Sequence, residues 1–179
     1  MITGAPSCGK TTLIKLLADR GFQTAPEGAR LYLESVLASG RTLEEERLNE
    51  ASMQRAIKNK QLEIELGLQA ADVIFLDRAL PDCLAWYRAF GLDPNEFLHE
   101  CFYYRYASVF ILDRLSLQLN GVRYKDDTLQ GFTEEWHIRD YRALGYRIVR
   151  VPVLPPEERV AYILDTLSEQ DMLQLKTIH

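Results

Sequence analysis

The sequence predicts an α/β fold of three layers built on a mostly parallel sheet of five strands. Two observations predict it. Short apolar runs alternate with amphipathic helical segments along the chain, as is typical of parallel strands joined by right-handed crossovers. Two of these runs, within residues 72–77 and 107–113, lack the polar alternation of a half-exposed strand. They therefore indicate strands buried on both faces.

The first half of the chain divides at glycines and at one capping pattern. We expect a helix over residues 10–20 that stops at Gly21, a strand over 22–25, and a helix over 29–38 closed by Gly40. Thr42 and Glu45 form a capping-box pattern, which predicts the start of a long charged helix reaching residue 71. Most charges of that helix are expected on a solvated face.

The second half alternates in the same way. We expect strands over 72–77, 107–113 and 146–153, and helices over 81–90, 95–106, 133–144 and 157–167. The helix over 133–144 stops at Gly145, and Pro155-Pro156 opens the last one. Only three residues precede Gly4, whereas strands usually have about 5–6. The first strand is therefore short, or it starts upstream of this sequence.

Composition limits the classes of function. The 179 residues suit a single domain, with 47% hydrophobic and 26% charged residues. A net charge of −5 argues against nucleic acid or a membrane surface as a partner. Cys8, Cys83 and Cys101 have no metal-ligand spacing and are interpreted as free thiols. With no membrane-length apolar run and no signal-type start, we expect a cytoplasmic protein.

Residues 4–11, GAPSCGKT, match the phosphate-binding pattern G-x-x-x-x-G-K-[ST] in full. The alternative, a chance match in a turn, is disfavoured by the β-branched lead-in and the amphipathic helix that follows. The motif predicts a P-loop NTPase fold that binds ATP with Mg²⁺, Lys10 reaching the β- and γ-phosphates and Thr11 ligating the metal. The expected phosphate-binding residues are Gly4, Ala5, Pro6, Ser7, Cys8, Gly9, Lys10, Thr11 and Thr12.

Asp77 ends a buried strand and is followed directly by Arg78. Four apolar residues before an acid resemble the second motif of phosphate-loop proteins, in which the acid holds Mg²⁺ or takes a proton from the attacking hydroxyl. Asp113 ends a similar strand, but no comparable segment follows it. Arg78 could neutralise phosphate charge at the same place. The alternative is a plain surface Asp–Arg pair at a strand end.

The segment from Asp77, DRALPDCLAWY, resembles the one after the catalytic strand in thymidylate and deoxynucleoside kinases. Over nearly the whole chain, six segments follow in order, and these are GAPSCGKT, PEGARLYL, the acid-ended third strand, NGVR, YRALGYRIVRVP and EERVAYIL. Because of this order, the sequence resembles the NadR-type ATPase/kinase domain. That AAA-domain family is related to ribosylnicotinamide kinase. The lid phrase departs from the family pattern, since Asn120-Gly121 stands where Asp-Gly is usual. No residue that would recognise a nicotinamide ring can be identified.

The resemblance implies further site residues. Glu27 would lie near the acceptor hydroxyl, and Arg123 would close over the transferring phosphate from a lid at about 115–127, with Arg114 as the second candidate. Arg30 could face the same cleft. Each has a plainer alternative, a helix-start acid for Glu27 and a solvated charge for Arg30. Residues 151–157 would flank the adenine.

Other candidates are weaker. The three histidines are isolated and are interpreted as structural or surface residues, and three aromatic residues at near-helical spacing are interpreted as core, although one could stack on a base. These are His99, His137 and His179, and Trp86, Tyr87 and Phe90.

Two functions remain open. The first is a small-molecule kinase that transfers the ATP γ-phosphoryl to a hydroxyl of an unidentified, nucleoside-like acceptor, with Lys10, Asp77, Arg78, Glu27 and Arg123 as catalytic residues and Thr11 and Asp77 as metal ligands. The second is an ATPase or nucleotide-dependent switch without an acceptor. Guanine specificity is disfavoured, because no N-K-x-D follows a strand.

Overall fold

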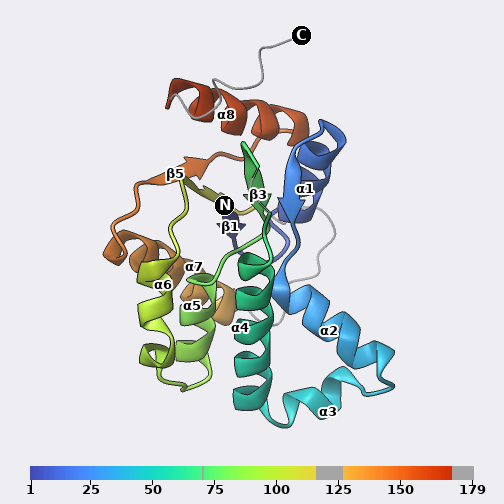
Figure 1. Ribbon diagram of the computed structural model, residues 1–179. Helices are drawn as coiled ribbons and strands as arrows, with labels where there is room; N and C mark the ends of the chain where they lie inside the picture. The colour runs from blue at the N-terminus through green and yellow to red at the C-terminus, as the bar shows by residue number, and fades with distance from the viewer. Residues whose placement is uncertain (70, 116–126, 171–179) are drawn as a thin grey trace.

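A computed structural model describes residues 1–69, 71–115 and 127–170 (Figure 1). Helices and strands alternate as predicted. In chain order the elements are β1 (Ile2–Gly4), α1 (Lys10–Asp19), β2 (Gln23–Ala25), α2 (Gly28–Ala38), α3 (Leu43–Arg47), α4 (Glu50–Leu66), β3 (Ile74–Leu76), α5 (Asp82–Ala89), the 3₁₀ turn η1 (Pro94–Glu96), α6 (Leu98–Tyr103), β4 (Val109–Leu112), α7 (Asp127–Ala143), β5 (Ile148–Val151) and α8 (Pro156–Glu169).

The strands pair in parallel. One ladder joins β1, β4 and β5, and a second joins β2 and β3. A single parallel bridge between Ile2 and Asp77 connects the two ladders, and the Arg78 amide donates to the Ile2 carbonyl at 2.9 Å. The five strands therefore lie in the order β2-β3-β1-β4-β5, which confirms the predicted parallel α/β fold. All their carboxyl ends meet at one edge, where ligands of such sheets bind.

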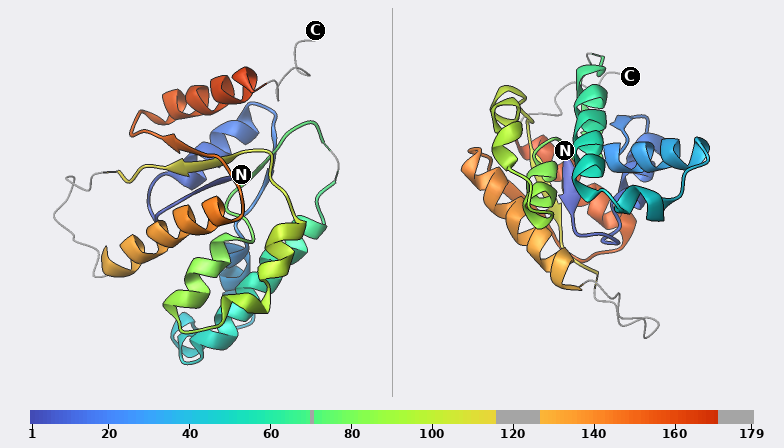
Figure 2. Two further views of the ribbon diagram at one scale, coloured as in Figure 1. Left: turned by 90° about the vertical axis from the view of Figure 1, so that its left-hand side faces the viewer. Right: turned by 90° about the horizontal axis from the view of Figure 1, so that it is seen from below.

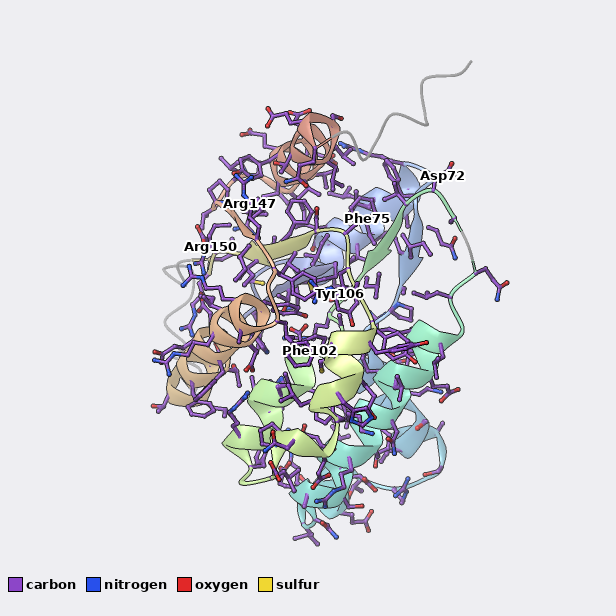
Figure 3. All side chains as sticks on the ribbon, turned by 60° about the vertical axis from the view of Figure 1, so that its left-hand side comes forward. Asp72, Phe75, Phe102, Tyr106, Arg147 and Arg150 are labelled. Carbon is purple, nitrogen blue, oxygen red and sulfur yellow. The ribbon has the colours of Figure 1, made fainter. Side chains whose placement is uncertain are left out.

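Side chains of successive strand residues enter two different cores, as strand geometry requires. In β4, Val109 and Ile111 belong to one buried cluster, while Phe110 and Leu112 belong to the other. Figures 1 and 2 show α1 and α8 on one face of the sheet and α5, α6 and α7 on the opposite face. In Figure 3, Phe75 and Tyr106 lie inside, whereas Asp72, Arg147 and Arg150 lie at the surface. The arrangement has the predicted three layers.

The prediction of one long helix over residues 42–71 is wrong. The Thr42–Glu45 capping box is present, but the helix that it opens, α3, ends after one turn. The side chain of Asn49 accepts a hydrogen bond from the Ser52 amide at 3.0 Å and starts a separate helix, α4. Asparagine is a strong N-cap residue, so this local hydrogen bond competes with continuation of the helix.

Two other boundaries differ from expectation. The helix predicted over 95–106 is a 3₁₀ turn followed by α6, and α7 starts at Asp127 rather than at residue 133. Within the described ranges, no helix combines the length and the apolar character needed to cross a membrane.

Candidate functional site

The phosphate-loop motif connects the end of β1 to the first turn of α1. Gly4 has φ 145° and Gly9 has φ 93°, values that glycine adopts at little cost. A Cβ on Gly4 would lie 2.9 Å from the Leu112 carbonyl oxygen, so no larger residue fits without moving β4. The backbone of this loop is therefore held tightly against the sheet.

Lys10 is buried inside this loop. Its ammonium donates to the carbonyl oxygens of Gly4 at 3.1 Å and Ala5 at 2.9 Å. Burial lowers the pKa of Lys10, and the nearby Arg78 charge lowers it further. A polyphosphate in the loop would replace these carbonyl contacts with full negative charges. Thr11 and Thr12 follow in the exposed first turn of α1.

Asp77 lies directly after β3, at the carboxyl edge of the sheet. Its side chain is buried, and within the described residues its Oδ1 atom has no hydrogen-bond partner. Burial raises the pKa of Asp77, and the Glu27 charge adds to that effect. An unpartnered buried carboxylate oxygen is costly unless a ligand completes it. An unpartnered oxygen suits the predicted role of Asp77 as a metal ligand, and that role and the one of Thr11 stay predictions.

Arg78 links this edge to the second half of the site. The residue has φ 68°, a left-handed conformation that is uncommon outside glycine. Its guanidinium donates to Glu27 Oε1 at 2.7 Å, to Asp82 Oδ1 at 3.1 Å and to the Gly4 carbonyl oxygen at 3.2 Å. Burial opposes the charge, but Glu27 and Asp82 outweigh burial and raise the pKa of Arg78. Arg78 therefore stays charged and fixed to the phosphate loop.

Asp82 is a site residue that sequence reasoning missed. It accepts hydrogen bonds from the Ala79 amide at 3.1 Å, from the Tyr141 hydroxyl at 2.6 Å and from the Thr3 hydroxyl. Burial opposes its ionisation, but His137, Arg78 and the Thr3 and Tyr141 hydroxyls lower its pKa overall. The signal was present in the sequence, since Asp82 is the second acid of D-R-x-x-x-D.

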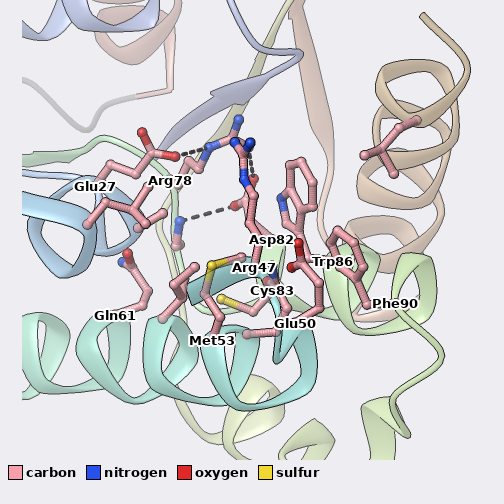
Figure 4. A pocket seen from close by; sticks show the side chains of 16 residues that line it. Glu27, Arg47, Glu50, Met53, Gln61, Arg78, Asp82, Cys83, Trp86 and Phe90 are labelled. Atoms are coloured by element: carbon pink, nitrogen blue, oxygen red, sulfur yellow. Dashed lines mark hydrogen bonds and ion pairs between the residues drawn. The ribbon is translucent and has the colours of Figure 1, made fainter. Parts of the chain in front are cut away.

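A pocket of about 510 Å³ opens beside Arg78, lined by residues of α2, α4 and α5, with Arg47 of α3 and Leu129 of α7 (Figure 4). Glu27 and Arg78 lie on one side of it, and Glu50 and Phe90 on the other. Its walls are mainly apolar. The volume lies in the range of small-molecule sites, and a few polar groups converge on an apolar interior, as is usual for such sites.

The two predicted acids and the arginine at the strand ends, Glu27, Asp77 and Arg78, are thus brought together next to Lys10. Arg30 pairs with Glu34 one turn further along α2, at 3.8 Å, and its charge also acts on Asp77, whose pKa it lowers. Arg114 bonds to Glu134 of α7. Arg123 and residues 116–126 of the predicted lid lie outside the described residues.

The aromatic and histidine residues singled out in the sequence lie in different environments. Tyr87 is fully buried in the core, while Trp86 and Phe90 line the pocket as a stacked pair with ring centroids 6.3 Å apart. His137 is buried next to Asp82, with 3.6 Å between Nε2 and Oδ1. His99 is exposed, and His179 lies outside the described residues.

Arg159 of α8 is a second residue whose role was not predicted from the sequence. Its buried guanidinium donates to three carbonyl oxygens, those of Cys8 at 2.7 Å, Pro152 at 2.8 Å and Asp113 at 3.0 Å. These acceptors lie in the phosphate loop and in the segments after β5 and β4. One side chain therefore holds three loops of the carboxyl edge together.

This fold and loop define a P-loop domain. A family model described as an AAA domain matches residues 1–159, so the chain belongs to that family. A crystal structure described as NadR protein in complex with NR matches with a TM-score of 0.68 and 15% sequence identity, over 99% of this chain and 52% of that one. The chain thus spans about half the length of that relative, and the likeness establishes the fold. A search of curated proteins found no match.

Proposed function

We propose that this protein is an ATP-dependent kinase that transfers the γ-phosphoryl group to a hydroxyl of a small, nucleoside-like molecule. The observation that carries the proposal is the position of Arg78. It lines the 510 Å³ pocket and also donates to the Gly4 carbonyl of the phosphate loop. A molecule in that pocket would therefore present its near end to the phosphates of a nucleotide held by the loop.

The residues have separate roles in this proposal. The loop amides and Lys10 bind and orient the β- and γ-phosphates. Asp77 accepts the proton of the attacking hydroxyl or orients that hydroxyl, and burial raises its pKa, which makes the carboxylate a better proton acceptor. Glu27 and Asp82 hold Arg78 at the junction. When bound, Mg²⁺ would neutralise phosphate charge as the phosphoryl group moves.

The bound structure of the relative supports this assignment. That protein was solved in complex with NR. In this chain, the pocket beside Arg78 is large enough for a molecule in addition to ATP in the loop. A separate acceptor pocket is expected of a kinase, whereas a nucleotide-dependent switch does not need one.

Screening distinguishes the two functions. ATP-dependent phosphorylation is measured against nucleosides, ribosylnicotinamide and related alcohols, with Lys10→Ala as the loop control. We expect one acceptor class to accelerate ATP turnover strongly, and Lys10→Ala to abolish tight ATP binding. Slow ATP hydrolysis without stimulation by any acceptor would favour the switch, and unchanged ATP affinity in Lys10→Ala would refute the role of the loop.

A further inference from the structure

The unmet hydrogen-bonding capacity of the pocket lies on the side away from Arg78. Glu50, the first residue of α4, lines the pocket, and its Oε2 atom is buried without a hydrogen-bond partner among the described residues. On the near side, by contrast, Glu27, Arg78 and Asp82 satisfy one another. A buried carboxylate oxygen with no donor is unfavourable, and a ligand N–H would relieve it.

Gln54 adds a second polar group to the same wall. It lies one helical turn after Glu50, lines the pocket and is 6% exposed. In the part of the chain that the structure describes, its side-chain amide makes no hydrogen bond, whereas Gln61 further along α4 binds the Gly28 amide. A primary amide offers both donors and an acceptor. Glu50 and Gln54 together can therefore form hydrogen bonds with a ligand edge that carries both a donor and an acceptor.

Two aromatic side chains lie near Glu50 in the lining of the pocket. Trp86 and Phe90 lie almost parallel, with 12° between the ring planes, and both line the pocket. Figure 4 shows Glu50, Trp86 and Phe90 together on the side of the pocket away from Glu27. Aromatic walls of this kind favour planar rings. Aromatic side chains beside an unpartnered carboxylate match a planar ring with N–H groups on its edge.

We propose that the far side of the pocket binds a planar heteroaromatic ring that carries an amino or amide N–H group, with Glu50 as the acceptor and Gln54 as its partner. This inference rests on the proposed kinase function, because it places the ring at the opposite end of the molecule from the hydroxyl that meets the phosphates. It makes Glu50 a specificity-determining residue rather than a catalytic one.

The test uses pairs of ribosides that differ at the donor. These are adenosine with purine riboside, cytidine with its 4-deamino analogue, and ribosylnicotinamide with its carboxylate counterpart. Phosphorylation by ATP gives kcat and KM, and calorimetry with Mg²⁺ and a non-hydrolysable ATP analogue gives affinity independently of chemistry. The variant is Glu50→Gln. Glu44→Gln is the matched control, because Glu44 is also an acid in the first turn of a helix and is exposed.

We expect the full-length protein to prefer the donor-bearing member of a pair by about tenfold or more in KM and in affinity, as for a hydrogen bond to a charged group. Glu50→Gln should remove most of that preference with kcat nearly unchanged, and Glu44→Gln should keep it. Equal use of both members of a pair, or a preference unchanged by Glu50→Gln, would overturn the inference. The proposed kinase function would still stand, and water would be the partner of Glu50. Failure of every riboside to bind beside a bound ATP analogue would also overturn it, whereas acceleration of ATP turnover by any other alcohol would still support the kinase.

Discussion

The buried carboxylate of Asp77 is the residue on which the proposed chemistry depends. Asp77→Asn keeps the shape but removes the negative charge and the proton acceptor. We expect kcat to fall by about 100-fold or more, while the affinity for ATP changes only a few-fold, because Lys10 and the loop amides remain. Turnover and ATP binding are measured on the same preparation.

Asp113→Asn is the matched control for Asp77, since Asp113 also ends a strand. Its carboxylate binds Arg150 in an exposed pair, and such pairs contribute little. We expect kcat within about twofold of the wild type. Equal losses in both variants would mean that Asp77 acts only through the charge of the strand ends.

His137 makes the stability of the protein depend on pH. Burial lowers its pKa to about 4, and the Arg78 and Lys10 charges oppose its protonation further, although Asp82 favours it. An unfolded histidine takes up a proton near pH 6.5. Between pH 6.5 and 4 the unfolded chain therefore binds more protons, and we expect the free energy of unfolding to fall by about 3 kcal/mol from this group.

Denaturant unfolding at a series of pH values measures this effect. His137→Gln should flatten the slope between pH 6.5 and 4, whatever its effect on stability at pH 7. Replacing the exposed His99 by Gln is the control for the loss of a histidine at the surface. A parallel pH dependence in the His137 variant and the wild type would contradict a neutral, buried imidazole.

At the scale of elements, helices α2 and α4 are in close contact at Gly28. A Cβ there would lie 2.8 Å from the Gln61 backbone nitrogen, and the Gln61 side chain already accepts from the Gly28 amide at 2.9 Å. Gly28→Ala must therefore move one helix, at a cost of about 1–3 kcal/mol. Because both helices line the pocket, we expect the acceptor KM to rise while ATP affinity stays unchanged.

Gly131→Ala in α7 is the comparison for this helix contact. A Cβ at Gly131 would meet its nearest neighbour, Arg114, at an ordinary 3.7 Å. The same substitution should then stabilise the protein by up to about 1 kcal/mol, because alanine favours a helix. Thermal unfolding of both variants gives the comparison, and a Gly28 variant as stable as the wild type would show that α2 and α4 can separate freely.

Elements governed by local signals were predictable, and those governed by distant contacts were not. The apolar runs ending at Asp77 and Asp113 gave β3 and β4 within two residues, because burial on both faces leaves a clear pattern. The break at Asn49 was missed because a polar helix carries little periodic signal to interrupt. Glu50 was expected on a solvated face, since nothing in its neighbourhood indicates the wall that α5 brings opposite it.

At the scale of the whole molecule, the candidate site is built where all five strands end. The phosphate loop follows β1, Glu27 follows β2, Asp77 follows β3, Asp113 follows β4 and Pro152 follows β5. The first three were predictable from motifs, because parallel strands bring their carboxyl ends to one edge. The contact that holds these strand ends together was not predictable. It depends on a side chain from α8 that meets the phosphate loop near the start of the chain.

Arg159 is that side chain, and its replacement should affect both the stability of the protein and the phosphate loop. Arg159→Met leaves the carbonyl oxygens of Cys8, Pro152 and Asp113 without their donor, and buried unsatisfied groups are costly. We expect the free energy of unfolding to fall by about 2–4 kcal/mol and the ATP KM to rise, because the loop backbone loses its support. The acceptor KM should change less, since the pocket lies beside Arg78.

Arg20→Met provides the control for Arg159, because Arg20 also joins α8 to the rest of the chain. It binds Glu157 at 2.7 Å, but both side chains are solvent-exposed, so we expect a change below about 1 kcal/mol. Denaturant unfolding and ATP titration are compared for both variants. If Arg159→Met lost stability with no change in ATP affinity, the loop would keep its shape without this arginine, and α8 would only cover the sheet. A joint loss, absent from Arg20→Met, would show that the last helix helps to shape the phosphate loop.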